Sequence, residues 1–274
     1  MTASLLSLDP RLHLIAIIFY AVASAVALLG AFLDRTMLKR LAPWLAAAGL
    51  LVHISAIAVR WAAVGHGPFI TKYENLSSYA LATAILALAS TRIRSMRGRG
   101  LDVVLYPVVL MLMAIGLYTG PEVRSLPPTF SGTWLVLHVC FYSIAFSAAA
   151  ACLSSSALLL LSPRRIGRLP SDPAELDAIA YRFGGLAFAF WGVGMLTGSV
   201  WAYYSWGRFW GWDPVETWSL VTWLVFGLYL HARRFYRLKG KPAAMLLIVC
   251  VVLAFWSLFG TSILTDSIHA VYFQ

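Results

Sequence analysis

Long apolar runs dominate this chain and constrain its fold more than any other feature. Each is long enough, or nearly so, to cross the roughly 30 Å hydrocarbon core of a bilayer as a helix. The runs are residues 12–33, 42–63, 76–91, 101–118, 134–161, 184–204, 217–235 and 243–262. They lack the alternating pattern of a barrel strand, so each must satisfy its backbone hydrogen bonds as a helix. We therefore expect an all-α polytopic membrane protein of about eight transmembrane helices.

The composition agrees with a membrane protein and excludes an ordinary soluble domain. Of 274 residues, 61% are hydrophobic and only 12% are charged, which is more apolar surface than one core can bury. The first run is long enough to span, so we expect it to remain as a helix and not to be cleaved as a signal peptide. No internal repeat separates the runs, and we expect one membrane domain over residues 1–274. The three cysteines, Cys140, Cys152 and Cys250, lie in apolar runs and are expected to be small buried side chains.

The basic residues predict the orientation of the spans. Alternate breaks between runs hold most of the 21 Lys and Arg residues: Arg35, Lys39, Arg40, Arg92, Arg94, Arg97, Arg99, Arg164, Arg165, Arg168, Arg182, Arg233, Arg234, Arg237, Lys239 and Lys241. The remaining ones are Arg11, Arg60, Lys72, Arg124 and Arg208. Cytoplasmic loops are rich in Lys and Arg, so the first set is cytoplasmic and both termini lie on the outer side. The net charge of +10 is thus a topology signal, and we expect no nucleic-acid partner.

Tryptophan is concentrated in residues 201–223, which read WAYYSWGRFWGWDPVETWSLVTW. An aromatic belt at the membrane interface is one explanation. A cluster this dense beside an Asp-Pro turn favours instead a flat apolar platform for a large planar ligand. The platform residues are Trp206, Trp210, Trp212 and Trp218. Gly207 and Gly211 would let the backbone approach that ligand, and Asp213 is also expected to cap the next helix.

Two histidines flank this loop on the predicted outer side. His138 lies at the outer end of the fifth run, and His269 lies just beyond the eighth. Either one alone is typical of a wet interfacial residue, but two beside one platform indicate haem, because neutral imidazoles on opposite faces of the macrocycle hold its iron. Binding of a metal ion without a porphyrin is an alternative that leaves the tryptophans unexplained. Arg208 and Arg124 could pair with the haem propionates.

Other ionisable residues lie within or near the spans. His231, near the inner end of the seventh run, is equally a ligand candidate and a bystander that snorkels to the interface. His53 is expected to hydrogen-bond between helices rather than to bind a ligand. Glu74 is expected to cap the third helix. His13 and His66 form no pattern.

The tryptophan-rich run resembles a known signature. Trp206 to Trp218, continuing to Trp223 and to Leu230-His231-Ala232-Arg233, resembles the WWD motif of the CcsA (ResC) family, part of the system II cytochrome c synthase. The likeness extends over most of the chain, from His53 to Trp61, through Pro68, Tyr73 and Glu74, then Trp134 to Val139, and to Gly260 and His269. Its Asp-Pro-x-Glu-Thr-Trp portion separates the chain from CcmC relatives and from HemX-like proteins.

The resemblance implies that haem b crosses the bacterial inner (plasma) membrane to its outer, periplasmic face. There it is joined by thioether bonds to the Cys-x-x-Cys-His segment of an apocytochrome c. The resemblance also implies that His138 and His269 are axial ligands of an outer haem, and that His231 binds an inner haem shared with the partner CcsB (ResB). The full expected haem-binding set is His138, His269, His231, Trp206, Trp210, Trp212, Asp213, Trp218 and Arg208.

We therefore expect a haem-lyase (synthase) subunit that is active with CcsB and supplies no nucleophile of its own, since the substrate brings the thiols. Three alternatives remain open. The first is a haem exporter or chaperone that makes no bond. The second is a HemX-like regulatory membrane protein, and the third is a solute transporter with an aromatic pocket.

Overall fold

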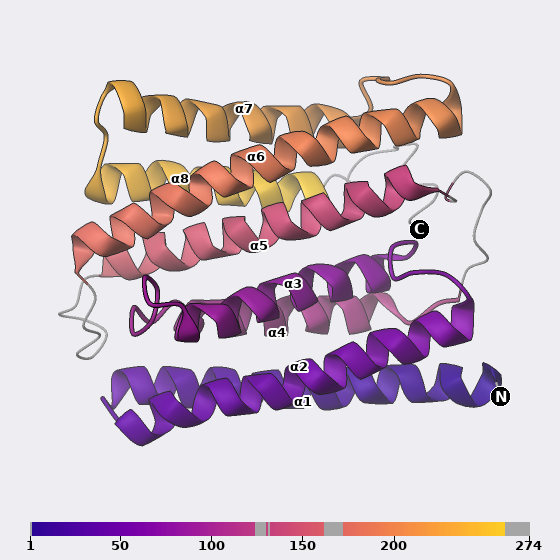
Figure 1. The fold of residues 1–274 in the computed structure, drawn as a ribbon, viewed down its shortest axis with the longest axis horizontal. Coiled ribbons are helices and arrows are strands. Elements are labelled where there is room, and N and C mark those ends of the chain that lie inside the picture. Colours follow the sequence, from indigo (N-terminus) through magenta and orange to yellow (C-terminus); the bar gives the residue numbers. More distant parts are fainter. Residues whose placement is uncertain (1, 124–129, 131, 162–171, 261–274) are drawn as a thin grey trace. The chain divides into compact units, whose positions relative to one another are not determined.

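A computed structural model of the chain describes residues 2–123, 130, 132–161 and 172–260. Within these ranges the prediction of an all-α fold is confirmed, with eight α-helices and no strand (Figure 1). They are α1 (Thr2–Phe32), α2 (Thr36–Val64), α3 (Lys72–Arg92), α4 (Asp102–Thr119), α5 (Thr133–Leu161), α6 (Pro173–Trp206), α7 (Pro214–Phe235) and α8 (Gly240–Phe255). A π-helical turn, Trp256–Gly260, extends α8.

Among the described residues, six helices are long and apolar enough to cross a membrane: α1, α2, α4, α5, α6 and α8. The chain is thus a polytopic membrane protein. The other two, α3 and α7, are long enough but carry more polar residues. Their sequences are those of the third and seventh predicted spans, so every predicted helix is present.

Two helices begin well before their apolar runs. The run at residues 184–204 belongs to α6, which starts at Pro173, and the run at residues 12–33 belongs to α1, which starts at Thr2. Hydropathy alone does not detect the first part of α6 because Glu175 and Asp177 interrupt it. This part of α6 forms a binding site for a residue on another helix, as described below.

The helices pack into two compact units. The first comprises α1–α4 and is called unit 1, and the second comprises α5–α8 and is called unit 2. Sequence analysis predicts one membrane domain over the whole chain. Whether the two units form one domain is not tested by the packing within each unit, so a single domain stays a prediction.

In unit 1 the four helices run back and forth in chain order (Figure 1). The short turn between α1 and α2 contains Asp34 with a positive φ of 51° and pairs that residue with Lys39 at 2.7 Å. An unusual feature of the interior is Arg60, only 2% exposed, whose guanidinium binds the carboxylates of Asp9 at 3.1 Å and Glu74 at 2.9 Å. Burying an arginine this deeply requires such partners.

In unit 2 an ion pair fixes the end of the bundle that is richest in basic residues. The two terminal guanidinium nitrogens of Arg233 on α7 donate to the two carboxylate oxygens of Asp177 on α6, at 2.7 and 2.8 Å. The backbone N–H of Gly240, at the start of α8, donates to the same carboxylate at 2.9 Å. One acidic residue therefore holds three helices in register.

The helices α3 and α7 start with the same device, a capping box. Thr71 and Glu74 cap α3, and Asp213 and Glu216 cap α7. In each pair the first side chain accepts a hydrogen bond from the first helical turn, and the glutamate reaches back to the N-cap backbone. The predicted capping roles of Glu74 and Asp213 are confirmed.

Candidate functional site

The candidate site lies at one end of unit 2, where three stretches of chain meet. They are the first turns of α5, the last turns of α6, and the loop 207–213 that leads into α7. We call this region the aromatic end. His138, Trp206, Trp210 and Trp212 belong to it, and Trp218 follows within the second turn of α7.

His138 is held against α6 in a defined orientation. Its Nδ1 lies 2.8 Å from the backbone oxygen of Gly194. A carbonyl can only accept, so Nδ1 carries the proton in this bond. The neutral ring then carries its lone pair on Nε2, the nitrogen that would bind iron. The ring also stacks on Trp201, with centroids 6.1 Å apart and planes 25° apart.

Two glycines of α6 make this position available. The His138 ring packs so closely on Gly198 that a Cβ there would overlap it. Gly194 supplies the carbonyl and packs against Tyr142. Sequence analysis did not assign these glycines. Their spacing, Gly194-x-x-x-Gly198, is the small-residue pattern that lets helices approach closely, and it was the available signal.

The loop is shaped by Glu216. Its Oε2 accepts hydrogen bonds from the backbone N–H groups of Gly211 at 2.8 Å and Asp213 at 3.2 Å. Asp213 in turn accepts from the N–H of Val215 at 2.9 Å. These bonds turn the chain back on itself just before α7.

At the tip of this turn Trp212 adopts a left-handed backbone conformation, with φ of 57°. Such a conformation costs a non-glycine residue free energy and persists only where its surroundings impose it. The indole is 70% exposed. The left-handed conformation of Trp212 therefore lowers the stability of the loop while it exposes a large apolar ring. Such an exposed ring is typical of a binding surface.

The tryptophans meet edge to face and do not lie in one plane. Trp210 and Trp212 have centroids 5.8 Å apart with planes at 85°, and Trp218 meets Trp256 at 6.0 Å and 77°. Trp206 packs in the same manner on Trp201. The indole nitrogens of Trp210 and Trp256 are buried without a hydrogen-bond partner among the described residues. Buried donors of this kind suit a ligand that brings acceptors, such as the carboxylates of haem.

Gly211 packs against an arginine of the same loop, and its expected close approach to a ligand stays a prediction. Its open side is covered by the guanidinium of Arg208, which a Cβ at Gly211 would overlap. The glycine therefore makes room for an arginine of the same loop. Arg208 is partly buried there.

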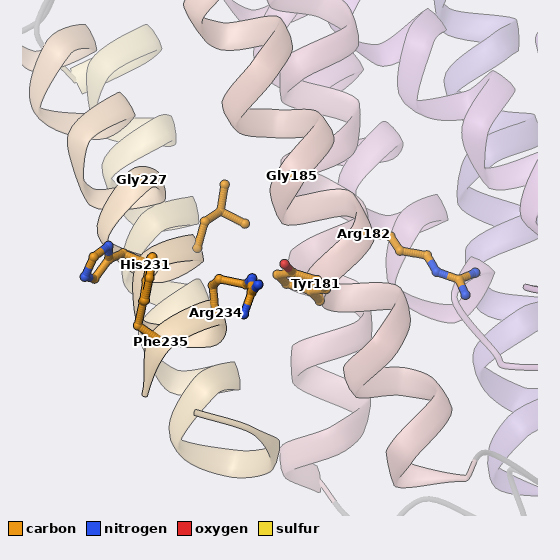
Figure 2. Close-up of a pocket in the computed structure, with 8 residues that line it drawn as sticks. Tyr181, Arg182, Gly185, Gly227, His231, Arg234 and Phe235 are labelled. Atoms are coloured by element: carbon orange, nitrogen blue, oxygen red, sulfur yellow. The ribbon is translucent and has the colours of Figure 1, made fainter. Parts of the chain in front are cut away.

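His231 lies at the opposite end of α7 and is exposed. It borders a groove of about 530 Å³ between α6 and α7. Tyr181, Arg182, Gly185, Gly227, Leu230, Arg234 and Phe235 complete the lining. In Figure 2 the side chain of Arg234 reaches toward Tyr181, whereas His231 and Arg182 point away from the groove on either side. The imidazole packs on Phe235, with ring centroids 4.4 Å apart, and lies 6.1 Å from the ring of Tyr236.

Other expectations are resolved as follows. His269 and Arg124 lie outside the described residues, so the second outer ligand stays a prediction. The expected helix-to-helix hydrogen bond of His53 is confirmed, since its Nε2 lies 2.8 Å from Ser77 Oγ. His13, to which sequence analysis assigned nothing, binds the same hydroxyl at 3.0 Å. The described residues contain no group of three or more His, Cys, Asp or Glu side chains that could hold a metal ion.

Comparison with protein families gives a match over most of the chain. The family model described as cytochrome C assembly protein matches residues 69–269. Among similar curated proteins is the cytochrome c biogenesis protein CcsA of Chlamydomonas reinhardtii, 31% identical over 229 residues. That match covers 80% of this chain and 65% of the algal protein, just under two thirds of its length. CcsA of Parasynechococcus marenigrum is 28% identical over 253 residues, covering 80% of this chain and 82% of that protein.

A solved structure has a similar fold. The cytochrome c heme lyase CcmF matches all of this chain with a TM-score of 0.66 and 20% sequence identity. The match covers 49% of that protein, so this chain spans about half its length. At this level of identity the likeness concerns the fold alone.

Proposed function

Because the chain belongs to the cytochrome c assembly protein family, and specifically resembles its CcsA members, we propose that it presents haem for covalent attachment to apocytochrome c. A role in cytochrome c biogenesis follows from the family. The proposal adds haem b as the cargo, a CcsB-type membrane protein as the partner, and the outer face of the bacterial plasma membrane as the place of reaction.

The proposed reaction is the addition of two thiols of a Cys-x-x-Cys-His segment across the two haem vinyl groups. Each addition forms one carbon–sulfur bond and places the thiol hydrogen on the neighbouring vinyl carbon, so no oxidant or reductant is consumed. The chain itself contributes position. His138 would bind iron through Nε2, Trp206, Trp210, Trp212 and Trp218 would surround the ring, and Arg208 would pair with a propionate.

One observation carries this proposal: the orientation of His138. The carbonyl of Gly194 holds the proton on Nδ1, and Gly198 lets the ring pack closely on α6. Metal-binding histidines commonly have their second nitrogen fixed in this manner, which sets both the tautomer and the direction of the ligand. The exposed ring of Trp212 and the buried indole nitrogen of Trp210 lie in the loop at the same end of unit 2.

His231 supports the part of the proposal that concerns an inner haem. The imidazole is exposed and faces away from its own groove (Figure 2). A ligand in this orientation suits a site completed by another protein. We therefore propose that the CcsB-type partner supplies the second ligand of the inner iron.

The test is a haem spectrum of the purified chain, prepared in detergent with and without a co-expressed CcsB-type partner. We expect oxidised and reduced absorption bands of bis-imidazole haem. His138→Ala should lose the outer haem, and added imidazole should restore it. His66→Ala is the matched control, since this histidine is buried in unit 1, and the variant should keep its haem.

Attachment needs a separate measurement. Apocytochrome c is added to the complex, and covalent product is detected by haem staining after denaturing electrophoresis. Haem-loaded protein without covalent product would reduce the function to haem export or chaperoning. Preparations with no haem at all would overturn the proposal.

A further inference from the structure

The groove between α6 and α7, at the end of unit 2 that holds the basic residues, is open and mostly apolar. It measures about 530 Å³, and Leu230 and Phe235 contribute apolar surface to it. Gly185 and Gly227 face each other across it without side chains (Figure 2). A Cβ added at Gly185 would meet no atom within 4 Å, so the α6 side of the groove is open there. Water gains little in such a groove, and a hydrocarbon chain fills it better.

Exposed aromatic and basic residues mark this end of the groove as the level of the lipid headgroups. Tyr181, Phe235 and Tyr236 are 38%, 69% and 78% exposed. Aromatic side chains gather at the membrane interface, and basic residues gather just beyond it. The exposed residues Arg237, Lys239 and Lys241 follow in the chain. From this level the groove runs along α6 and α7 into their apolar parts.

Arg234 supplies the positive charge within the groove. Its side chain reaches toward Tyr181, as Figure 2 shows. The adjacent Arg233 is neutralised by Asp177, at 2.7 and 2.8 Å. Arg234 takes part in none of the ion pairs among the described residues, and its guanidinium carbon lies 6.0 Å from the centroid of the Phe235 ring.

The groove therefore has positive charge that no residue of its lining balances. Arg182 and His231 border it, and no Asp or Glu is among the described residues that line it. The carboxylates of Asp172 and Glu175, at the start of α6, are not part of the lining. A ligand with an anionic end and an apolar chain would complement both parts of this site.

We infer that the groove binds one anionic phospholipid, with its phosphate on Arg234 and one acyl chain between Gly185 and Gly227. A planar guanidinium donates two parallel hydrogen bonds to a phosphate, and Tyr181 offers a hydroxyl beside it. Basic pockets between membrane helices bind anionic headgroups in this manner. A zwitterionic lipid would bring an ammonium group next to Arg234, so an anionic headgroup is preferred.

The lipid site is separate from the proposed inner haem ligand. His231 points away from the groove (Figure 2), so a lipid on Arg234 leaves the imidazole accessible. The inference does not depend on haem binding, and both ligands can be present together.

The experiment titrates the full chain, purified in detergent, with phosphatidylglycerol or with phosphatidylcholine of the same acyl chains. Native mass spectrometry counts the bound lipids. We expect the first phosphatidylglycerol to bind more tightly than phosphatidylcholine. Arg234→Gln should weaken it by about fivefold or more, the share that one basic residue contributes near an anionic headgroup. Arg237→Gln is the control, because Arg237 is exposed at the same end and does not line the groove.

A second variant tests the place of the acyl chain. Gly185→Leu puts an apolar side chain into the open space without a clash and should weaken both lipids, although Arg234 is unchanged. Leu186→Phe adds bulk at an exposed neighbour outside the groove and should have no effect. Circular dichroism checks that each variant is folded, and Arg234→Gln alone decides the question if Gly185→Leu is not.

Three results would overturn the inference. The first is equal affinity of the wild-type protein for the two lipids. The second is unchanged phosphatidylglycerol binding in a folded Arg234→Gln or Gly185→Leu variant. The third is displacement of the lipid by added haem or by a co-expressed CcsB-type partner, which would assign the groove to that ligand instead.

Discussion

The interior of unit 1 and the aromatic end of unit 2 differ in how they satisfy side chains that are unfavourable to bury or to expose. Unit 1 buries Asp9, Arg60 and Glu74 almost completely and satisfies each with partners from other helices. The aromatic end instead leaves the ring of Trp212 outside, and among the described residues the buried indole nitrogen of Trp210 has no acceptor.

The difference separates two roles that sequence patterns alone do not distinguish. A satisfied polar cluster stabilises a fold. An exposed apolar surface next to an unsatisfied donor is complete only when a ligand is present. We therefore expect substitutions in unit 1 to change stability first, and substitutions at the aromatic end to change haem binding first.

The largest expected effect is that of Arg60→Leu. It leaves Asp9 and Glu74 buried without their cation, and removing one partner of a buried ion pair costs about 3–5 kcal/mol. The free energy of unfolding, measured by denaturant titration in detergent, should fall by that amount. Arg11→Leu, an exposed arginine on the same unit, should change it little. Equal effects of the two variants would show that the ion pairs do not stabilise unit 1.

Gly198→Ala tests the other side of the comparison. The added methyl group overlaps the His138 ring and should displace it from the Gly194 carbonyl. Loss of such an orienting contact lowers metal affinity by about 10–100-fold, so the haem content of the purified protein should fall while the helices stay folded. Leu196→Ala, on the exposed face of α6, is the control. Full haem occupancy in Gly198→Ala would exclude His138 as an oriented ligand.

Asp213→Ala should moderately lower both the stability of the protein and its affinity for haem. It removes the N-cap of α7, which costs about 1 kcal/mol of stability, and it loosens the turn that presents Trp212. Thermal unfolding and haem titration on the same preparation would measure the two effects. Thr71→Ala removes the corresponding cap of α3 and should lower stability without lowering haem affinity. If both variants lost haem equally, the proposed difference between the two regions would be wrong.

The smallest expected effect is an increase in stability, whereas the preceding variants lower it. Trp212→Gly relieves the left-handed backbone and should raise stability by about 1 kcal/mol, while haem affinity falls because the exposed ring is gone. A melting curve and a haem titration again report the two quantities. A variant that lost stability would show that the indole serves packing rather than presentation.

Much of the fold could be predicted from the sequence because insertion in a membrane depends on local composition. The apolar runs located every helix, and the Asp-Pro-x-Glu pattern located the cap of α7. The start of α6 was missed because Asp177 does not look like part of a span. Its role becomes visible only when Arg233, distant in sequence, binds it.

The site could be predicted only in part, for the same reason. The dense tryptophans and His138 were found because they are unusual in themselves. The bond of His138 to the Gly194 carbonyl and the hydrogen bonds of His13 and His53 to Ser77 depend on residues that meet across helices. His13 and Ser77, for example, are 64 positions apart. Contacts between residues so far apart cannot be read from a single sequence.

The two capping boxes have a consequence for how this protein is made. Among the five helices whose N-caps are described, only α3 and α7 begin with a capping box, and these are also the two that lack a sufficiently apolar stretch to cross a membrane unaided. During biosynthesis such segments gain little by entering lipid alone. A cap completed within four residues fixes where the helix starts before its neighbours arrive. We therefore expect α3 and α7 to insert late, each as one arm of a hairpin with the apolar helix that follows it.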